Sequence, residues 1–146
     1  MKKSARFHPI QQLTERRQQE AAQALGKSNQ VVSEQEQRLS ELQQYRLEYQ
    51  RYVLQQGQGG ITAARLMELQ RFLHSLDQAI SQQQNTLERV CAEREKKRQL
   101  WQQAHGKSVA MAKVVERFRE DEAYLEARRE QKEADEYSQR GKRGDY

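Results

Sequence analysis

The fold is decided by residues 66–129, which read LMELQRFLHSLDQAISQQQNTLERVCAEREKKRQLWQQAHGKSVAMAKVVERFREDEAYLEARR. Steps of three and four residues, taken alternately from Leu66, land mostly on apolar side chains. These seam positions are Leu66, Leu69, Leu73, Leu76, Ile80, Gln83, Leu87, Val90, Arg94, Lys97, Trp101, Ala104, Ser108, Met111, Val115, Phe118, Glu122, Leu125 and Arg129. A repeat of about 3.5 residues is the period of a left-handed coiled-coil seam. The stretch is therefore predicted to be one long helix that needs a partner along most of its length.

The only strong helix breaker in the middle of the chain is the sequence Gln56-Gly57-Gln58-Gly59-Gly60. Glycine readily adopts the left-handed backbone angles that a helix end and a chain reversal require. Thr62, or a residue just before it, can then cap a new helix. Because a short connection makes two helices antiparallel neighbours, we expect an all-α fold. It would be a long antiparallel two-helix coiled-coil hairpin, with the second helix longer than the first. The alternative is a flexible linker between helices that pair with other chains.

The expected boundaries describe one coiled-coil domain over residues 1–146. The first helix would cover about 7–56, the turn 57–61 and the second helix about 62–140, followed by a disordered tail at 141–146.

Folding about the glycines would place residue i near residue 118 − i, to within a turn or so. Phe7 would then lie opposite Met111, and residues from about 112 to 140 would project past the first helix. Phe118 would have no partner in this chain.

Two helical phases are possible for the first helix, whose apolar stripe begins with Phe7, Ile10 and Leu13. One seam would run through Gln35, Leu39, Leu42, Arg46, Tyr49 and Val53, and the other through Arg38, Leu42, Tyr45, Tyr49 and Tyr52. Whichever is buried, apolar or aromatic residues of the other lie beside it.

The composition is typical of a solvated helical protein rather than a compact one. Charged residues make up 32% of the chain and the hydrophobic class only 35%. The net charge is +5, but the signs mostly alternate, as on a solvated helix face. A nucleic-acid binder more often carries a one-sided basic stripe. The lone cysteine excludes an internal disulfide and fits a reducing compartment. No uncharged apolar run is long enough to span a bilayer. We therefore expect a cytoplasmic protein with no direct membrane insertion and no nucleic-acid partner.

The sequence contains no recognisable catalytic motif. His8, His74 and His105 are scattered and lack a second ligand at i+3 or i+4. Cys91 follows the seam residue Val90, and a cysteine so placed is more often a small packed residue than a nucleophile. We therefore predict no enzymatic activity, no catalytic residue, no cofactor and no metal.

Two motifs near the turn would share one patch beside the seam. They are Leu42-x-x-Tyr45-x-x-x-Tyr49 and Phe72-Leu73-x-x-Leu76-x-x-Ala79-Ile80. Aromatic residues in such clusters are frequent in binding hot spots. The alternative is a broadened hydrophobic core.

With the terminal run Lys132-x-x-Asp135-Glu136, a short basic start, a Gly-rich turn near residue 58 and a longer second helix, these motifs resemble the flagellar type III export protein FliJ over nearly the whole chain.

The resemblance implies a coiled coil similar to the central stalk of rotary ATPases. Such a stalk would be a monomer at the cytoplasmic face of the inner membrane. It would sit in the hexameric ring of a FliI-like export ATPase and promote its assembly or activity. It would also contact a FlhA-like export-gate protein and export chaperones.

The gate-binding surface that the resemblance implies consists of Leu42, Tyr45, Tyr49, Phe72, Leu76 and Ala79. Arg38 and Gln83, on the same strip, depart from the family's Gln and His. The ATPase ring is expected to contact the helix ends remote from the turn, at Phe7, Ile10, Phe118, Tyr124, Leu125, Asp135 and Glu136.

Three other interpretations remain open at this point. One is the equivalent stalk protein of a virulence type III secretion system. Another is a generic structural or nucleic-acid-binding coiled coil. A third is a homodimer that buries the projecting segment against its own copy.

Overall fold

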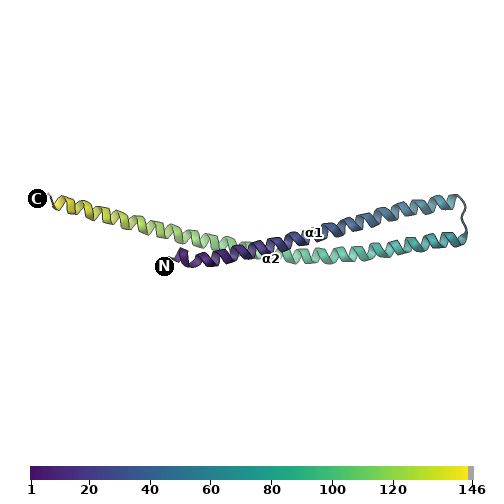
Figure 1. Ribbon diagram of the computed structural model, residues 1–146, viewed down its shortest axis with the longest axis horizontal. Coiled ribbons are helices and arrows are strands. Elements are labelled where there is room, and N and C mark those ends of the chain that lie inside the picture. Colours follow the sequence, from purple (N-terminus) through teal and green to yellow (C-terminus); the bar gives the residue numbers. More distant parts are fainter. Residues whose placement is uncertain (145–146) are drawn as a thin grey trace. The chain divides into compact units, whose positions relative to one another are not determined.

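In the part of the chain that the structure describes, two long helices form an antiparallel hairpin (Figure 1). The computed structural model describes residues 1–144. Helix α1 is Lys3–Gln58, with 56 residues, and helix α2 is Ala63–Arg143, with 81 residues. The predicted fold class, with the second helix longer than the first, is confirmed.

The helix bounds differ from the predicted ones at the two chain ends. Helix α1 begins at Lys3 rather than near residue 7, so Pro9 lies inside the helix instead of in its first turn. Contacts with α2, described below, hold this early segment in place. Helix α2 continues through Gly141 to Arg143, where a disordered tail had been expected. The last two residues of that expected tail, 145–146, lie outside the described residues.

The reversal depends on one glycine and one threonine. The Gly59 N–H donates to the Gln55 carbonyl at 3.2 Å, and Gly60 has φ of +76°, in the left-handed region that favours glycine. Thr62 then caps α2, because its hydroxyl accepts a hydrogen bond of 3.2 Å from the Arg65 N–H. The predicted capping role of Thr62 is confirmed.

The predicted seam of α2 is confirmed as far as Glu122. Every seam position from Leu66 to Glu122 is buried or half-buried, with the sole exception of Lys97. The buried ones are Leu69, Leu76, Val90, Ser108 and Val115. Leu125 and Arg129 keep the spacing but are exposed, so the seam ends at Glu122.

The structure decides between the two phases of α1 in favour of the first. Its buried and half-buried seam positions are Ser4, Phe7, Gln11, Thr14, Gln18, Ala21, Leu25, Ser28, Val32, Gln35, Leu39, Leu42, Arg46, Tyr49, Val53 and Gln56. Steps of three and four alternate without interruption along this list, as on α2. Arg38, Tyr45 and Tyr52 are exposed beside the seam. Ile10 and Leu13, expected in the apolar stripe, are exposed as well.

The chain divides into two compact units. We call Ala22–Leu100 the turn unit, and Met1–Ala21 with Trp101–Tyr146 the terminal unit. In the turn unit Tyr45 lies beside Phe72, close to the predicted pairing.

In the terminal unit the predicted register is wrong, because Phe7 lies beside Phe118 rather than Met111. The non-helical residues Gly59–Thr62 are centred later than the glycines on which the prediction was based. If the centre of the reversal moves by one residue along the chain, the α2 residue opposite any given α1 residue moves by two positions. The part of α2 without a partner helix therefore begins near residue 123, not 112.

Candidate binding surfaces

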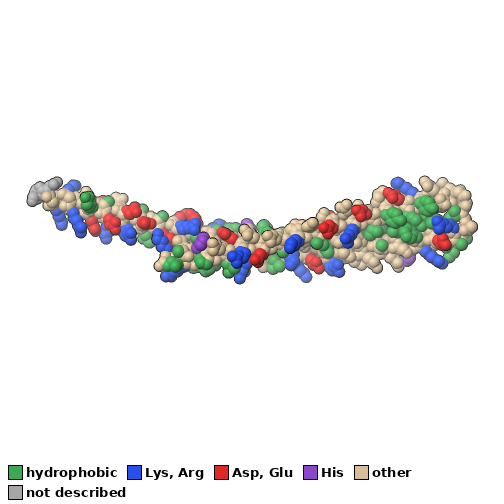
Figure 2. All heavy atoms as spheres, in the orientation of Figure 1, with side chains coloured by type: hydrophobic (Ala, Val, Ile, Leu, Met, Phe, Trp, Pro, Cys, Tyr) green, Lys and Arg blue, Asp and Glu red, His purple; other side chains and the backbone are tan. Residues whose placement is uncertain are grey.

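An aromatic patch, formed by Tyr45, Tyr49, Tyr52 and Phe72, lies in the turn unit. The Phe72 ring is 4.6 Å from that of Tyr49 and 6.3 Å from that of Tyr45, which it meets edge to face. The Tyr49 and Tyr52 rings are 6.0 Å apart. Tyr45 is 48% exposed and Phe72 41%. Figure 2 shows hydrophobic side chains gathered on one face next to the turn. Both helices thus contribute to one accessible aromatic surface.

The structure brings the predicted gate-binding residues together but does not expose them equally. Leu42, Tyr49 and Ala79 are half-buried beside the exposed Tyr45 and Phe72. Leu76 is only 7% exposed, so it packs in the core beneath the patch. Tyr52 is an accessible member that the sequence motifs missed, because the phase of α1 was open.

The patch lies on one flank of the seam only. Tyr45 and Tyr52 directly precede seam positions on α1, and Phe72 precedes one on α2. On the other flank, the residues that border the seam are those that follow a seam position reached by a step of three, and they are Gln43, Gln50, Gln70 and Asp77. The exposed Leu47, Leu54 and Met67 lie farther from the seam. The turn unit therefore has an aromatic flank and a polar flank.

Two polar contacts cross the seam of the turn unit. Arg46, at a seam position of α1, pairs with Asp77 of α2; a hydrogen bond and charge from Arg46 lower the pKa of the Asp77 carboxyl. The Gln83 amide donates to the carbonyl and side-chain oxygens of Gln35, at 3.1 and 2.7 Å. Polar groups at such positions favour one register.

A shallow hollow of about 380 Å³ adjoins the aromatic patch. It is lined by Arg38, Glu41, Leu42, Tyr45 and Gln83. Arg38 and Gln83, which the resemblance places on one strip with the predicted gate-binding residues, thus line the same hollow.

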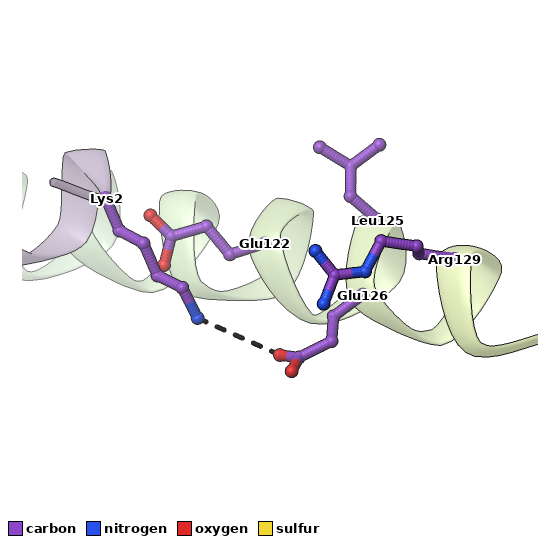
Figure 3. Close-up of a pocket in the computed structure, with 5 residues that line it drawn as sticks. All are labelled: Lys2, Glu122, Leu125, Glu126 and Arg129. Carbon is purple, nitrogen blue, oxygen red and sulfur yellow. Dashed lines mark ion pairs between the residues drawn. The ribbon is translucent and has the colours of Figure 1, made fainter.

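In the terminal unit, the first residues of the chain are clamped onto α2. The Ser4 N–H donates to Glu122 Oε1 at 3.0 Å and the Ser4 hydroxyl to Oε2 at 2.6 Å. The hydroxyl bond, then the backbone bond, lowers the pKa of the Glu122 carboxyl. Lys2 Nζ lies 3.8 Å from Glu126 Oε2 (Figure 3). The first turn of α1 has no acidic residue of its own, so Glu122 supplies the negative charge that a helix N-terminus favours.

An aromatic pair lies beside this clamp. The Phe7 and Phe118 rings are 5.2 Å apart, and Lys3 Nζ lies 5.6 Å from the centre of the Phe118 ring. The expectation that Phe118 has no partner in this chain is therefore wrong.

The other residues predicted for the ATPase ring are all exposed. They are Ile10, Tyr124, Leu125, Asp135 and Glu136. Figure 3 shows the Leu125 side chain pointing away from the Lys2–Glu126 ion pair. Every residue from Ala123 to Gly144 is exposed, including Tyr137 at 82%. We call Ala123–Arg143 the free segment of α2.

Within residues 1–144, no group of three or more His, Cys, Asp and Glu side chains is placed to hold a metal ion. In the same part of the chain, neither helix contains a stretch apolar enough to cross a membrane.

A helical hairpin with a regular 3-4 seam on both helices belongs to the class of antiparallel coiled-coil proteins. The family model described as "Flagellar FliJ protein" matches residues 2–144, and the chain therefore belongs to the FliJ family. This membership makes it a flagellar export-related protein, in a family of structural and export components. No curated protein and no solved structure matches the chain.

Proposed function

We propose that this protein is a stalk-like coiled coil of the flagellar export apparatus. Its terminal unit inserts into the ring of the export ATPase and promotes the ring's assembly or activity. Its turn unit contacts the export gate, and it also handles export chaperones. It would work at the cytoplasmic face of the inner membrane, held there by the apparatus.

The observation that carries the proposal is the free segment of α2. It continues for about 30 Å at the helical rise of 1.5 Å per residue, and every side chain from Ala123 to Arg143 is exposed. A helix this long gains little stability from propensity alone and is normally stabilised by packing. A ring around it would supply that packing.

The charges of the free segment suit a charged ring lining. Over residues 126–136 five acidic side chains are mixed with three basic ones, whereas the last turn carries only basic ones, at Arg140, Lys142 and Arg143. A ring with complementary bands would orient the helix along its axis, because opposite potentials steer and align partners.

The stalk itself would contribute no reacting group. It would raise the ATPase rate by binding one conformation of the ring more tightly than another, since only differential affinity shifts such an equilibrium.

The aromatic patch is the surface best suited to the gate. Buried Tyr and Phe side chains contribute much of the binding energy in protein interfaces, and partly exposed rings offer that area before binding. Tyr45, Tyr52 and Phe72 are the exposed rings on this flank.

The test is truncation at the end of the seam. A chain ending at Glu122 keeps the Ser4–Glu122 contact and should remain helical, but it should lose most of its stimulation of the cognate export ATPase. The matched control is full-length protein with Tyr45→Ala and Phe72→Ala, which should stimulate normally. Full stimulation by the truncated chain would refute the docking role of the free segment.

A further inference from the structure

In the terminal unit, α1 covers an apolar face of α2 with mostly polar side chains. Its seam positions are Ser4, Phe7, Gln11, Thr14, Gln18 and Ala21, of which only Phe7 is large and apolar. The buried and half-buried seam positions of α2 in this unit are Trp101, Ala104, Ser108, Met111, Val115, Phe118 and Glu122, of which only Ser108 and Glu122 are polar. Because burial of apolar area on both sides drives helix pairing, this part of α1 is held weakly for its length.

The turn unit provides the contrast within the same helix. There α1 contributes Leu25, Val32, Leu39, Leu42, Tyr49 and Val53 to the seam. The first five turns of α1 therefore lack the apolar positions that hold the rest of the helix.

The helix itself is weakened in the same segment. Pro9 has no N–H, so the Ala5 carbonyl loses its helical partner. Ile10 and Leu13, the large apolar residues that follow, are both exposed and add little to the contact with α2.

What holds the segment is concentrated at its first residues. The Ser4–Glu122 hydrogen bonds, the Lys2–Glu126 ion pair and the Phe7–Phe118 contact all lie within the first turns. Hydrogen bonds to a carboxylate are stronger than those between neutral groups. Where they are partly exposed, however, water can replace the donor. Loss of a few such contacts would free the whole segment.

We propose that Lys3–Ala21 is a releasable cover, latched to α2 by the Ser4–Glu122 contact. Its release bares Met111, Val115 and Phe118 of α2, so that Trp101–Glu122 joins the free segment in one longer docking helix for the ATPase ring. The ring as occupant rests on the proposed function, whereas the separate opening of the cover does not.

The opening is tested in the full-length free protein by amide hydrogen exchange. Amides of Gln11–Ala21 should exchange at least about tenfold faster than those of Val32–Val53, since local opening exposes one unit without the other. Glu122→Gln should speed exchange in the cover and leave Val32–Val53 unchanged. The matched control is Glu120→Gln, an exposed carboxylate on the same helix, which should change neither. Equal protection in the two segments, or no response to Glu122→Gln, would overturn the proposal.

The consequence for the ring is tested by locking the cover. Cysteines at Ser4 and Glu122, in a Cys91→Ser background, would be joined by a short bismaleimide, and the same protein capped with N-ethylmaleimide would serve as the open control. The capped protein should stimulate the export ATPase several-fold more than the joined one. Equal stimulation would refute the ring as the occupant of the bared face. If Cys91→Ser protein with its native Ser4 and Glu122 does not stimulate either, the stalk function fails, while the exchange experiment still decides whether the cover opens.

Discussion

The turn unit and the terminal unit are built from the same two helices with the same 3-4 spacing, yet they are stabilised differently. In the turn unit both helices place apolar side chains in the seam, and Val32, Leu69, Leu76 and Val90 are buried there. In the terminal unit the seam of α1 is largely polar. On α2 this unit has two buried residues, Val115 and the polar Ser108.

This difference shows that a regular seam is not a uniform one. Where both helices are apolar, packing along the seam holds the pair, and the Arg46–Asp77 and Gln35–Gln83 contacts add to it. Where only α2 is apolar, the pairing depends on polar contacts at the very start of α1, such as Ser4–Glu122. The turn unit, held by packing, is suited to present a binding surface in a fixed geometry. The terminal unit, held by the latch, is suited to a segment that exchanges one partner for another.

The largest expected effect is on core stability. Leu69 is 2% exposed, and Leu69→Ala should lower the free energy of global unfolding by about 2–5 kcal/mol, as for other buried leucines. Phe7→Ala in the terminal unit should have a much smaller global effect, because that unit would open on its own. Denaturant unfolding followed by circular dichroism would measure both. Equal losses would mean that the two units unfold as one.

The next largest effect is on binding of the export gate, which should depend on the turn unit alone. Tyr45→Ala with Phe72→Ala should weaken binding of the export gate by about 2 kcal/mol or more if these rings are hot spots. Both side chains are exposed, so helicity should stay near wild type. Leu47→Ala is the matched control, because Leu47 is also exposed but lies about 200° around α1 from Tyr45 at the helical rotation per residue. Calorimetry with the soluble part of the gate would show the difference. A large fall in helicity would instead identify the tyrosine and phenylalanine as core residues.

The smallest effect is the pH dependence of the latch. The pKa of Glu122 is lowered mainly by the Ser4 hydroxyl and the Ser4 N–H, with a contribution from the charge of Lys2. The carboxylate therefore stabilises the closed terminal unit above the ordinary glutamate value of about 4.3. That stabilisation is lost as the pH falls through the lowered value.

The pH effect is visible by NMR. The Ser4 amide shift should titrate with a midpoint below the ordinary glutamate value, and contacts between the Phe7 and Phe118 rings should weaken over the same range. In Glu122→Gln protein the Ser4 amide should not titrate there. A midpoint at the ordinary value would show that the latch does not form in solution.

The seam of α2 could be predicted because its positions from Leu66 to Glu122 stand out by spacing alone. The phase of α1 could not, since one phase places Arg46 and Val53 in the seam and the other places the aromatic Tyr45 and Tyr52 there, so neither is clearly the more apolar. Only packing against α2 separates the two sets.

The register of the two helices and the Ser4–Glu122 contact could not be predicted from the sequence either, for a related reason. A reversal can be centred on any of several glycines, and a shift of one residue moves the pairing by two. Without the register, Glu122 is one carboxylate among many, and nothing in its neighbours marks it as the partner of Ser4. The gate-binding and ring-binding residues, the chaperones, the monomeric state and the location at the membrane remain predictions.

The central claim is that the two units serve different partners, and site-specific photo-crosslinking in cells with an assembled export apparatus tests it most directly. A crosslinking amino acid at Tyr137, in the free segment, should attach to the export ATPase, and one at Tyr52, in the aromatic patch, should attach to the export gate. Attachment of both probes to the same partner, or exchange of the two partners, would contradict the account.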